Sequence, residues 1–474
     1  MSVGLARVTI SAPQRRVDVA LPEHVPLAEL LPEVLRHAGE GLADDGEKHG
    51  GWVLRRTDGV ALATAQGLFA QGVRDGEVLY LVPAHDSWPE LEYDDVVEAI
   101  AEGARRRGSV WTPSSTRTAT LVAAGALLTL GLIAILRAGP AWDGGAIAGL
   151  GLAILLALAG VTASRAYGDG CAGAALGAYA MPFAFAGGAV LVATGDRAGV
   201  LGPVPWLGGS ELLTGSMALL LVSALGGVGV AGSLRLFTAG AVIGLLGSLI
   251  ALVTVVTDAA GAAAVLLAVL VCGIGALPLL AIRFGKMPTP PVTLPTGAEA
   301  AEGFTVGNTL DAARSRPDRA TVFAAVSRTE ELLAGMLLGH VVLAAGAFLV
   351  LATAGSVSAR ILMAVSAAAL LLRSRLFVTL RQRVPLVAGG LIGIVALGVD
   401  LLRDAGPGLL LLVTGGTLAL AVITVVAGAT YSRRPPSPYL GRAADLLDTL
   451  VVVSVIPVAC AVVGLYAAVG DLGI

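Results

Sequence analysis

The chain contains the uncharged stretch TATLVAAGALLTLGLIAIL at residues 118–136. A helix needs roughly 20 consecutive apolar residues to cross the hydrocarbon core of a bilayer, and this stretch is close to that length. The whole chain of 474 residues is 56% hydrophobic and only 14% charged. Soluble domains are about 25% charged, so the composition argues against an ordinary soluble enzyme and predicts a polytopic membrane protein.

Further apolar stretches of similar length follow the first, and a polar segment of nearly 50 residues divides them into six and five. The predicted spans are residues 118–138, 144–164, 171–194, 211–232, 235–256, 260–281, 331–353, 357–372, 385–402, 407–428 and 446–469. The chain has 63 glycines, and aromatic residues make up only 4% of it. This is the composition of closely packed transmembrane helices.

The basic residues between the spans predict how the chain is oriented. One set of loops holds Arg165, Arg235, Arg283, Lys286, Arg314, Arg316, Arg319, Arg328, Arg373, Arg375, Arg381, Arg383, Arg433, Arg434 and Arg442. The opposite loops hold only Arg137, Arg197, Arg360 and Arg403. Because cytoplasmic loops carry the excess of basic residues, we expect the N-terminus in the cytoplasm and, with an odd number of spans, the C-terminus outside the plasma membrane.

Residues 1–84 predict a small cytosolic α+β domain. Two short alternating strands, near residues 7–13 and 16–21, precede an amphipathic helix that spans about 27–39. Strands at 52–56, 60–62 and 77–82 follow, with a helical turn at 64–70. This element order is that of a ubiquitin-like β-grasp.

Residues 85–117 form the expected linker to the membrane. Residues 94–107 begin with acidic and end with basic side chains, which suits the dipole of an amphipathic helix. Arg105, Arg106 and Arg107 then lie just before the first span. They are candidates for contact with anionic lipid headgroups, or they form an ordinary solvated helix end that also signals topology.

Glycine pairs at GxxxG spacing occur in several spans. Such pairs allow two helix backbones to approach closely, and we interpret them together as evidence for tight packing rather than as separate dimer motifs. The candidate packing residues are Gly145 and Gly149, Gly173 and Gly177, Gly240 and Gly244, Gly335 and Gly339, and Gly389 and Gly393.

The spans offer little chemistry. His340 is the one ionisable residue expected well inside a span, either as a functional group or as a neutral side chain hydrogen-bonded to a neighbouring helix. Acidic residues such as Asp400 are expected at span ends, near water. Cys171, Cys272 and Cys460 lie in apolar stretches without metal-ligand spacing. We therefore expect no catalytic residues, no cofactor, no metal site and no nucleic-acid partner.

The segment 283–330 between the two groups of spans is expected to be a cytosolic loop, followed by the remaining spans in 331–474. It contains a proline-rich stretch, and Arg314, Arg316, Arg319 and Arg328 follow on a helical pattern. One hypothesis is that this loop and the N-terminal domain form a docking surface for a partner. The alternative is that these arginines only signal topology.

Several short motifs, in this order, resemble the EccD family, the polytopic membrane core component of type VII (ESX) secretion systems of actinobacteria. They are RRVDVALP at 15–22, GWVLRR at 51–56, QGVRDGE at 71–77, DDVV at 94–97 and RTEELL at 328–333. The resemblance implies a non-enzymatic subunit that packs with lipid and other core subunits, forms a homodimer within a larger complex and docks the cytosolic ATPase of the complex through its soluble head.

A secondary transporter with a cytosolic regulatory domain is the alternative function. The two groups of spans are faintly similar to a two-halved carrier, but coupling residues at mid-depth are missing and the number of spans is odd. A membrane-embedded enzyme is a more distant possibility, because we find no polar cluster for it.

Overall fold

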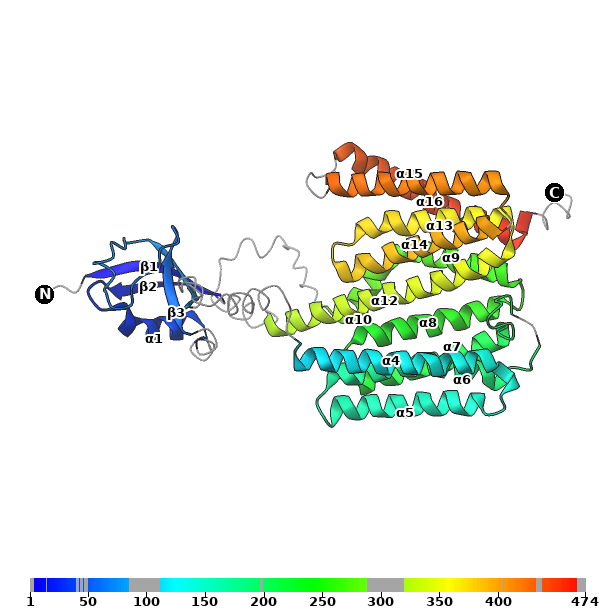
Figure 1. Cartoon of the computed structure of the whole chain (residues 1–474), viewed down its shortest axis with the longest axis horizontal. Helices are drawn as coiled ribbons and strands as arrows, with labels where there is room; N and C mark the ends of the chain where they lie inside the picture. The colour runs from blue at the N-terminus through cyan, green and yellow to red at the C-terminus, as the bar shows by residue number, and fades with distance from the viewer. Residues whose placement is uncertain are drawn as a thin grey trace, which may run out of the picture. The chain divides into compact units, whose positions relative to one another are not determined.

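The computed structural model describes residues 4–13, 15–39, 42, 46, 50–84, 111–196, 199–287, 319–403, 405–431 and 437–466. The chain divides into two compact units, Met1–Thr112 and Pro113–Ile474. The first is the head and the second is the membrane unit, both drawn in Figure 1.

The head is built on a four-stranded mixed sheet. Its elements are β1 (Leu5–Ser11), β2 (Arg16–Pro22), α1 (Leu27–Ala38), β3 (Trp52–Arg56) and β4 (Val78–Pro83). The strand order is β2-β1-β4-β3, and β1 pairs parallel with β4 while both outer pairs are antiparallel. This is the ubiquitin-like topology that the element order predicts. The strand predicted at 60–62 is wrong, since it is reduced to one bridge between Arg55 and Ala61.

Alternation along the strands places one side of the sheet in the core of the head. Val8 and Ile10 of β1 and Leu79 and Leu81 of β4 are buried, while their neighbours along each strand are more exposed. The apolar face of α1 packs in the same cluster. An ion pair joins the end of β3 to the residue just before β4, where Arg56 Nε donates a 2.6 Å hydrogen bond to Glu77 Oε1.

The membrane unit contains helices, several with a 3-10 turn at their end. They are α4 (Pro113–Ala138), η2 (Gly139–Ala141), α5 (Gly145–Arg165), α6 (Gly170–Val192), α7 (Gly209–Gly229), α8 (Leu234–Val253), α9 (Ala259–Gly273), η3 (Ile274–Ala276), α10 (Leu277–Gly285), α12 (Arg319–Ala354), α13 (Val357–Arg373), η4 (Ser374–Leu376), α14 (Leu380–Arg403), α15 (Pro407–Tyr431) and α16 (Pro438–Val463).

Within the described residues, 11 helical segments are long and apolar enough to cross a membrane, as the sequence predicts. The sixth segment is interrupted, because the 3-10 turn η3 separates α9 from α10 just before Pro278. In contrast, Pro182 and Pro457 lie inside the continuous helices α6 and α16. Helices in lipid tolerate proline where their neighbours satisfy the freed backbone groups.

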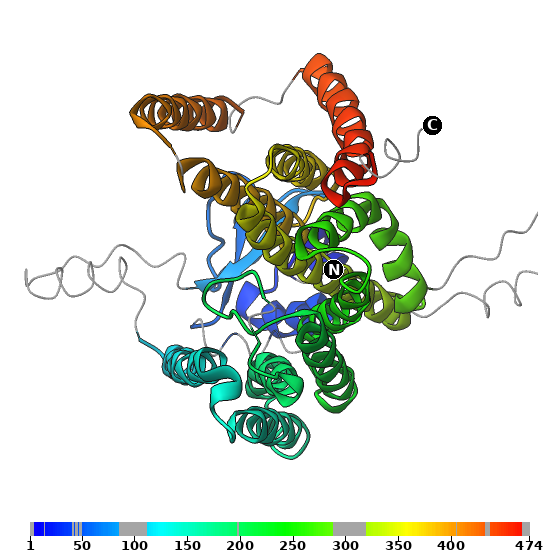
Figure 2. The same cartoon turned by 90° about the vertical axis from the view of Figure 1, so that its right-hand side faces the viewer.

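The helix α12 is the centre of the membrane unit. It packs against α8, α9, α10, α13 and α14, and residues such as Leu337, Phe348 and Leu351 are fully buried in the largest core cluster. It begins at Arg319, so the last residues of the predicted loop 283–330 form its first turns. By contrast, α15 lies at the edge of the unit, and no residue of it is buried (Figure 2).

Candidate functional site

The predicted glycine pairs lie at contacts between helices. A Cβ atom added to Gly149 of α5 would lie 2.7 Å from the Cα atom of Gly187 on α6, so the two backbones touch. Gly145 is different, because its nearest neighbour would be the Trp142 side chain at an ordinary 3.4 Å. On α6, a Cβ on Gly173 would lie 2.7 Å from the carbonyl oxygen of Gly160.

The same close approach recurs towards the centre of the unit. On α8, a Cβ on Gly240 would lie 2.2 Å from Ser223 Oγ of α7, and one on Gly244 would lie 2.7 Å from the Leu220 nitrogen. On α12, a Cβ on Gly335 would lie 2.5 Å from the carbonyl oxygen of Arg235 at the start of α8.

The remaining glycines complete the contacts around α12 and α6. The distances from a Cβ atom added at each glycine are 2.9 Å for Gly339 to the Ala239 oxygen, 3.2 Å for Gly389 to Val341, 2.7 Å for Gly393 to Phe348 and 2.6 Å for Gly177 to Phe237. Side chains larger than hydrogen would therefore separate α12 from α8 and from α14.

A buried ion pair joins α13 to α14. Arg360 Nε lies 2.6 Å from Asp400 Oδ2, and Asp400 is only 2% exposed. The expectation that Asp400 lies near water is therefore wrong. The sequence places it at a span end, but the rotation of α14 turns its side chain towards α13, where Arg360 meets it. The sequence does contain a hint of this pair, since Arg360 and Asp400 are predicted at span ends on the same side of the membrane.

Further ion pairs involve residues at the end of α13 and at the start of α14. Arg373 Nε is 3.7 Å from Asp448 Oδ1 of α16, and Arg373 Nη1 donates a 2.9 Å hydrogen bond to the carbonyl oxygen of Val271. Arg381 Nη1 of α14 lies 3.0 Å from Glu331 Oε1 of α12. Several predicted topology arginines thus also bind neighbouring helices.

His340 is buried on α12. Its Nδ1 donates to the carbonyl oxygen of Met336, 2.9 Å away and one turn earlier in the same helix. The sequence leaves open a hydrogen bond to a neighbouring helix, but the observed partner is in its own helix. This geometry satisfies one ring nitrogen of His340 within α12 itself.

Of the four arginines of the predicted docking surface, Arg319 and Arg328 lie within the described residues. Arg319 and Arg328 are exposed on the first turns of α12. Their separation along the helix is about two and a half turns, so the two side chains project from opposite sides. Arg314, Arg316 and the candidate headgroup contacts Arg105, Arg106 and Arg107 lie outside the described residues.

The glycine contacts and the cross-helix ion pairs both join neighbouring helices of the membrane unit. Among the described residues, no group of three or more His, Cys, Asp or Glu side chains could hold a metal ion. The ion pairs at both ends of α13 join charged side chains of different helices, which favours one rotation of each helix.

Comparisons with known proteins cover both units. Residues 116–472 match the family model of the EccD-like transmembrane domain, and residues 5–81 match that of YukD, a protein of the WXG100 protein secretion system. The ESX-4 secretion system protein eccD4 of Mycobacterium tuberculosis (strain CDC 1551 / Oshkosh) is 28% identical over 498 residues, covering 99% of this chain and 98% of that protein.

Solved structures show the same fold. Protomer 1 of the ESX-3 core complex superposes with a TM-score of 0.59 at 20% identity, covering 98% of this chain and 100% of that one. A chain of the MycP5-free ESX-5 inner membrane complex gives a TM-score of 0.54 at 20% identity, covering 90% and 99%. With a ubiquitin-like head and a matching transmembrane domain over most of its length, the chain belongs to the EccD family of multi-pass membrane proteins.

Proposed function

We propose that this protein is a non-enzymatic membrane subunit of a type VII (ESX) secretion complex. The observation that carries the proposal is the combination, in one chain, of the EccD-like transmembrane domain and the ubiquitin-like head. The protein packs with lipid and other core subunits and docks the cytosolic ATPase of the complex through its head. Energy for transport then comes from the ATPase and not from this chain.

The packing of the membrane unit supports a scaffold role. Helices that meet through glycine backbones and cross-helix ion pairs have little freedom to slide, whereas a carrier must alternate between two arrangements. Purification of the native complex in mild detergent tests this function. We expect the ATPase and other core subunits to co-purify, whereas solute uptake by the isolated chain in liposomes would favour the transporter instead.

The first turns of α12 are the part of the proposed docking surface that lies within the described residues. Arg319 is followed one turn later by Phe323, whose side chain is 65% exposed, so a basic and an aromatic group share one side of the helix. Exposed aromatic and arginine side chains are the residues that dominate binding in protein interfaces. We include Arg314, Arg316 and Arg328 in this surface, and Arg105–Arg107 as headgroup contacts, on sequence grounds.

Charge reversal tests the docking surface. The variant with Arg314, Arg316, Arg319 and Arg328 changed to Glu should recover less partner subunit in the same purification. Reversing Arg403, which is predicted on the opposite side of the membrane, is the matched control and should leave recovery unchanged. Equal recovery from both variants would mean that the arginines only set topology.

The helix α15 supports the proposal of a homodimer. Every other transmembrane helix has buried residues, but all described residues of α15 are at least partly accessible (Figure 2). Gly415 and Gly416 at its middle would have no atom within 4 Å of an added Cβ, so a second helix could approach them closely. We propose that α15 packs against a second copy within the complex.

Cysteine cross-linking tests this contact. In a background without Cys171, Cys272 and Cys460, Gly415→Cys should give a cross-linked dimer in native membranes. Gly151→Cys on α5 is the matched control, since Gly151 also has open space where its Cβ would lie. Dimers from Gly151→Cys, or from both positions equally, would place the contact elsewhere.

A further inference from the structure

The helices α15 and α16, which we call the C-terminal hairpin, have few buried residues. No described residue of α15 is buried, and the buried residues of α16 are Val451, Val455 and Ala459. These three residues lie four positions apart, so they form one narrow stripe along α16. Because α16 packs against α9 and α13, this stripe and the polar side chains near the start of α16 hold the hairpin to the rest of the unit.

Arg373, the last residue of α13, joins three helices. Its Nη1 donates a 2.9 Å hydrogen bond to the carbonyl oxygen of Val271 on α9, and its Nε lies 3.7 Å from Asp448 Oδ1 on α16. Val271 is one of the last four residues of α9, whose carbonyl groups have no donor within the helix. A Cβ atom added to Gly275 of η3 would lie 4.0 Å from Arg373 Nη1. Arg373 therefore connects α16 to the interruption in the sixth span.

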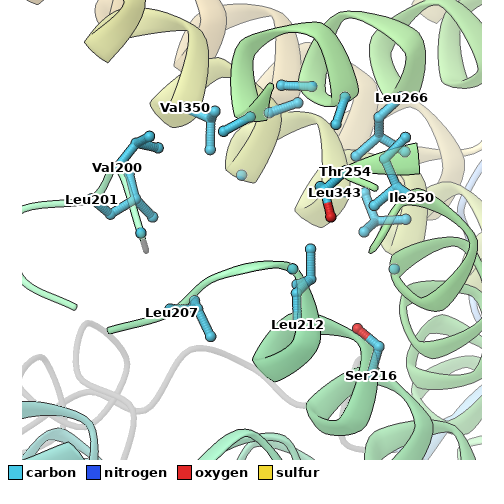
Figure 3. Close-up of a pocket in the computed structure, with 18 of the residues that line it drawn as sticks. Val200, Leu201, Leu207, Leu212, Ser216, Ile250, Thr254, Leu266, Leu343 and Val350 are labelled. Atoms are coloured by element: carbon cyan, nitrogen blue, oxygen red, sulfur yellow. The ribbon is translucent and has the colours of Figure 1, made fainter. Parts of the chain in front are cut away.

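The helix α9 has open space on one of its other sides. Figure 3 shows Leu266 of α9 beside a recess that is also lined by Ile250 of α8 and Leu343 of α12. Elsewhere α9 packs against α12, α13 and α16. Because part of α9 faces this recess, its position depends more on the contacts that α16 and Arg373 make with it.

The contact between Arg373 and Asp448 is incompletely satisfied. The two side chains are only 14% and 24% exposed. Even so, Arg373 Nε and Asp448 Oδ1 are both buried and have no hydrogen-bond partner among the described residues. At 3.7 Å the two atoms are too far apart for a hydrogen bond, whereas Arg360 and Asp400 approach to 2.6 Å. A buried polar atom without a partner costs free energy, and this cost disappears where water reaches the atom.

We propose that Arg373 forms a releasable contact that holds the C-terminal hairpin against α9 and α13. In the closed arrangement the guanidinium group binds the Val271 carbonyl and attracts Asp448, and the stripe of α16 is buried. In the open arrangement Asp448 leaves Arg373 and reaches water, and the hairpin moves away from α9 and α13 while the helices around α12 keep their contacts. In a dimer joined through α15, this movement shifts one copy relative to the other, and only this last step rests on the proposed function.

A second ion pair provides the matched comparison. Arg375 Nη2 of η4 lies 3.3 Å from Asp445 Oδ1, which is also on α16. These side chains are 37% and 75% exposed, and the hydrogen bond of the Arg375 side chain within the described residues is to Asp445. Solvated pairs of this kind contribute little to stability. Removing Arg375 should therefore leave the hairpin closed, although it removes the same charge from the same end of α13.

Spin-label distances in the full-length chain, with one copy in each lipid nanodisc, test the proposal. Cys171, Cys272 and Cys460 are first changed to Ala. Labels at Ile154 of α5 and Val453 of α16 then measure the hairpin, because α5 and α16 lie on opposite sides of the unit (Figure 1, Figure 2). Labels at Ile154 and Val395 of α14 are the control pair. All three labelled side chains are exposed, so the labels leave the packing intact.

The parent chain and two variants give the expected results. In the parent, the distance distribution of the hairpin pair should be broader than that of the control pair. Losing a hydrogen bond from a charged group should raise the ratio of open to closed hairpin about tenfold in Arg373→Gln. The control pair should not change in this variant, and Arg375→Gln should match the parent for both pairs.

A double variant separates release of the hairpin from general misfolding. Arg373→Met/Asp448→Leu replaces both charged groups by apolar side chains, which leaves no unpaired group between α13 and α16. We expect this variant to restore the closed distance that Arg373→Gln loses. A chain that was misfolded for lack of Arg373 would not be restored in this way.

Three results would overturn the proposal. The first is a hairpin distribution in Arg373→Gln equal to that of the parent, and the second is an equal change in Arg375→Gln. The third is equal widths for the hairpin and control pairs in the parent, which needs no variant and remains decisive even if Arg373→Gln does not fold. Because single isolated copies are measured, none of these results depends on dimer formation or on assembly into a secretion complex.

Discussion

The ion pair between Arg360 and Asp400 makes a quantitative prediction about stability. Asp400→Leu removes the carboxylate that lies 2.6 Å from Arg360 Nε, and the Arg360 side chain is 30% exposed. Breaking a buried pair by removing one charge costs about 3–5 kcal/mol. Because Arg360 keeps some access to solvent, we expect the free energy of unfolding to fall by roughly 2–3 kcal/mol.

The exposed pair between Arg381 and Glu331 is the matched comparison. Its distance of 3.0 Å is similar, but the Arg381 side chain is 70% exposed. Pairs in this setting contribute about 0–1 kcal/mol, so Glu331→Leu should have a small effect. Denaturant unfolding of the full chain in detergent, followed through tryptophan fluorescence, measures both variants against the parent.

The double variant Arg360→Leu/Asp400→Leu separates the pair from the packing around it. Replacing both charges of a buried pair by apolar side chains is often close to neutral. The double variant should therefore be more stable than Asp400→Leu alone. Losses of equal size for Asp400→Leu and Glu331→Leu, or a double variant as unstable as the sum of its single changes, would refute the reasoning.

Other predictions concern packing, pH and topology. Gly149→Leu should separate α5 from α6 and lower the melting temperature of the chain, whereas Gly151→Leu on the open side of α5 should not. The Arg56 hydrogen bond lowers the pKa of Glu77 below its usual 4.5. The ion pair between Arg56 and Glu77 therefore stabilises the head fully above about pH 4.5, and this stabilisation is lost as the pH falls through the lowered pKa of Glu77. Acid should therefore speed hydrogen exchange of β3 and β4 less in the full-length Glu77→Gln variant than in the parent chain. Reporter fusions in the 195–210 loop and after Ile474 should both report an extracytoplasmic location, and a cytoplasmic signal from either would contradict the predicted orientation.

The sequence predicts the spans and the head well because each depends on local patterns. Long uncharged stretches define the membrane helices, and alternation in 16–21 and 77–82 defines two strands of the sheet. The prediction of a strand at 60–62 is wrong because this short segment pairs with β3 at one position only. Ala61 forms an isolated bridge with Arg55, and no strand extends from it.

The interactions between helices could not be predicted in the same way. The pairing of Arg360 with Asp400 depends on how far α13 and α14 rotate, which the packing of the whole unit decides. Spacing within one helix identifies the glycines, but it does not identify which neighbour each one meets.

The length of α12 has a mechanical consequence. Its 36 residues extend about 54 Å, well beyond the roughly 30 Å of a hydrocarbon core, and Figure 1 shows it reaching past the end of α8. Its N-terminal half carries Arg319 and Phe323, and its C-terminal half holds the fully buried Phe348 and Leu351. Any force applied to those first turns is therefore carried along one continuous helix to the glycine contacts between α12 and its neighbours α8 and α14.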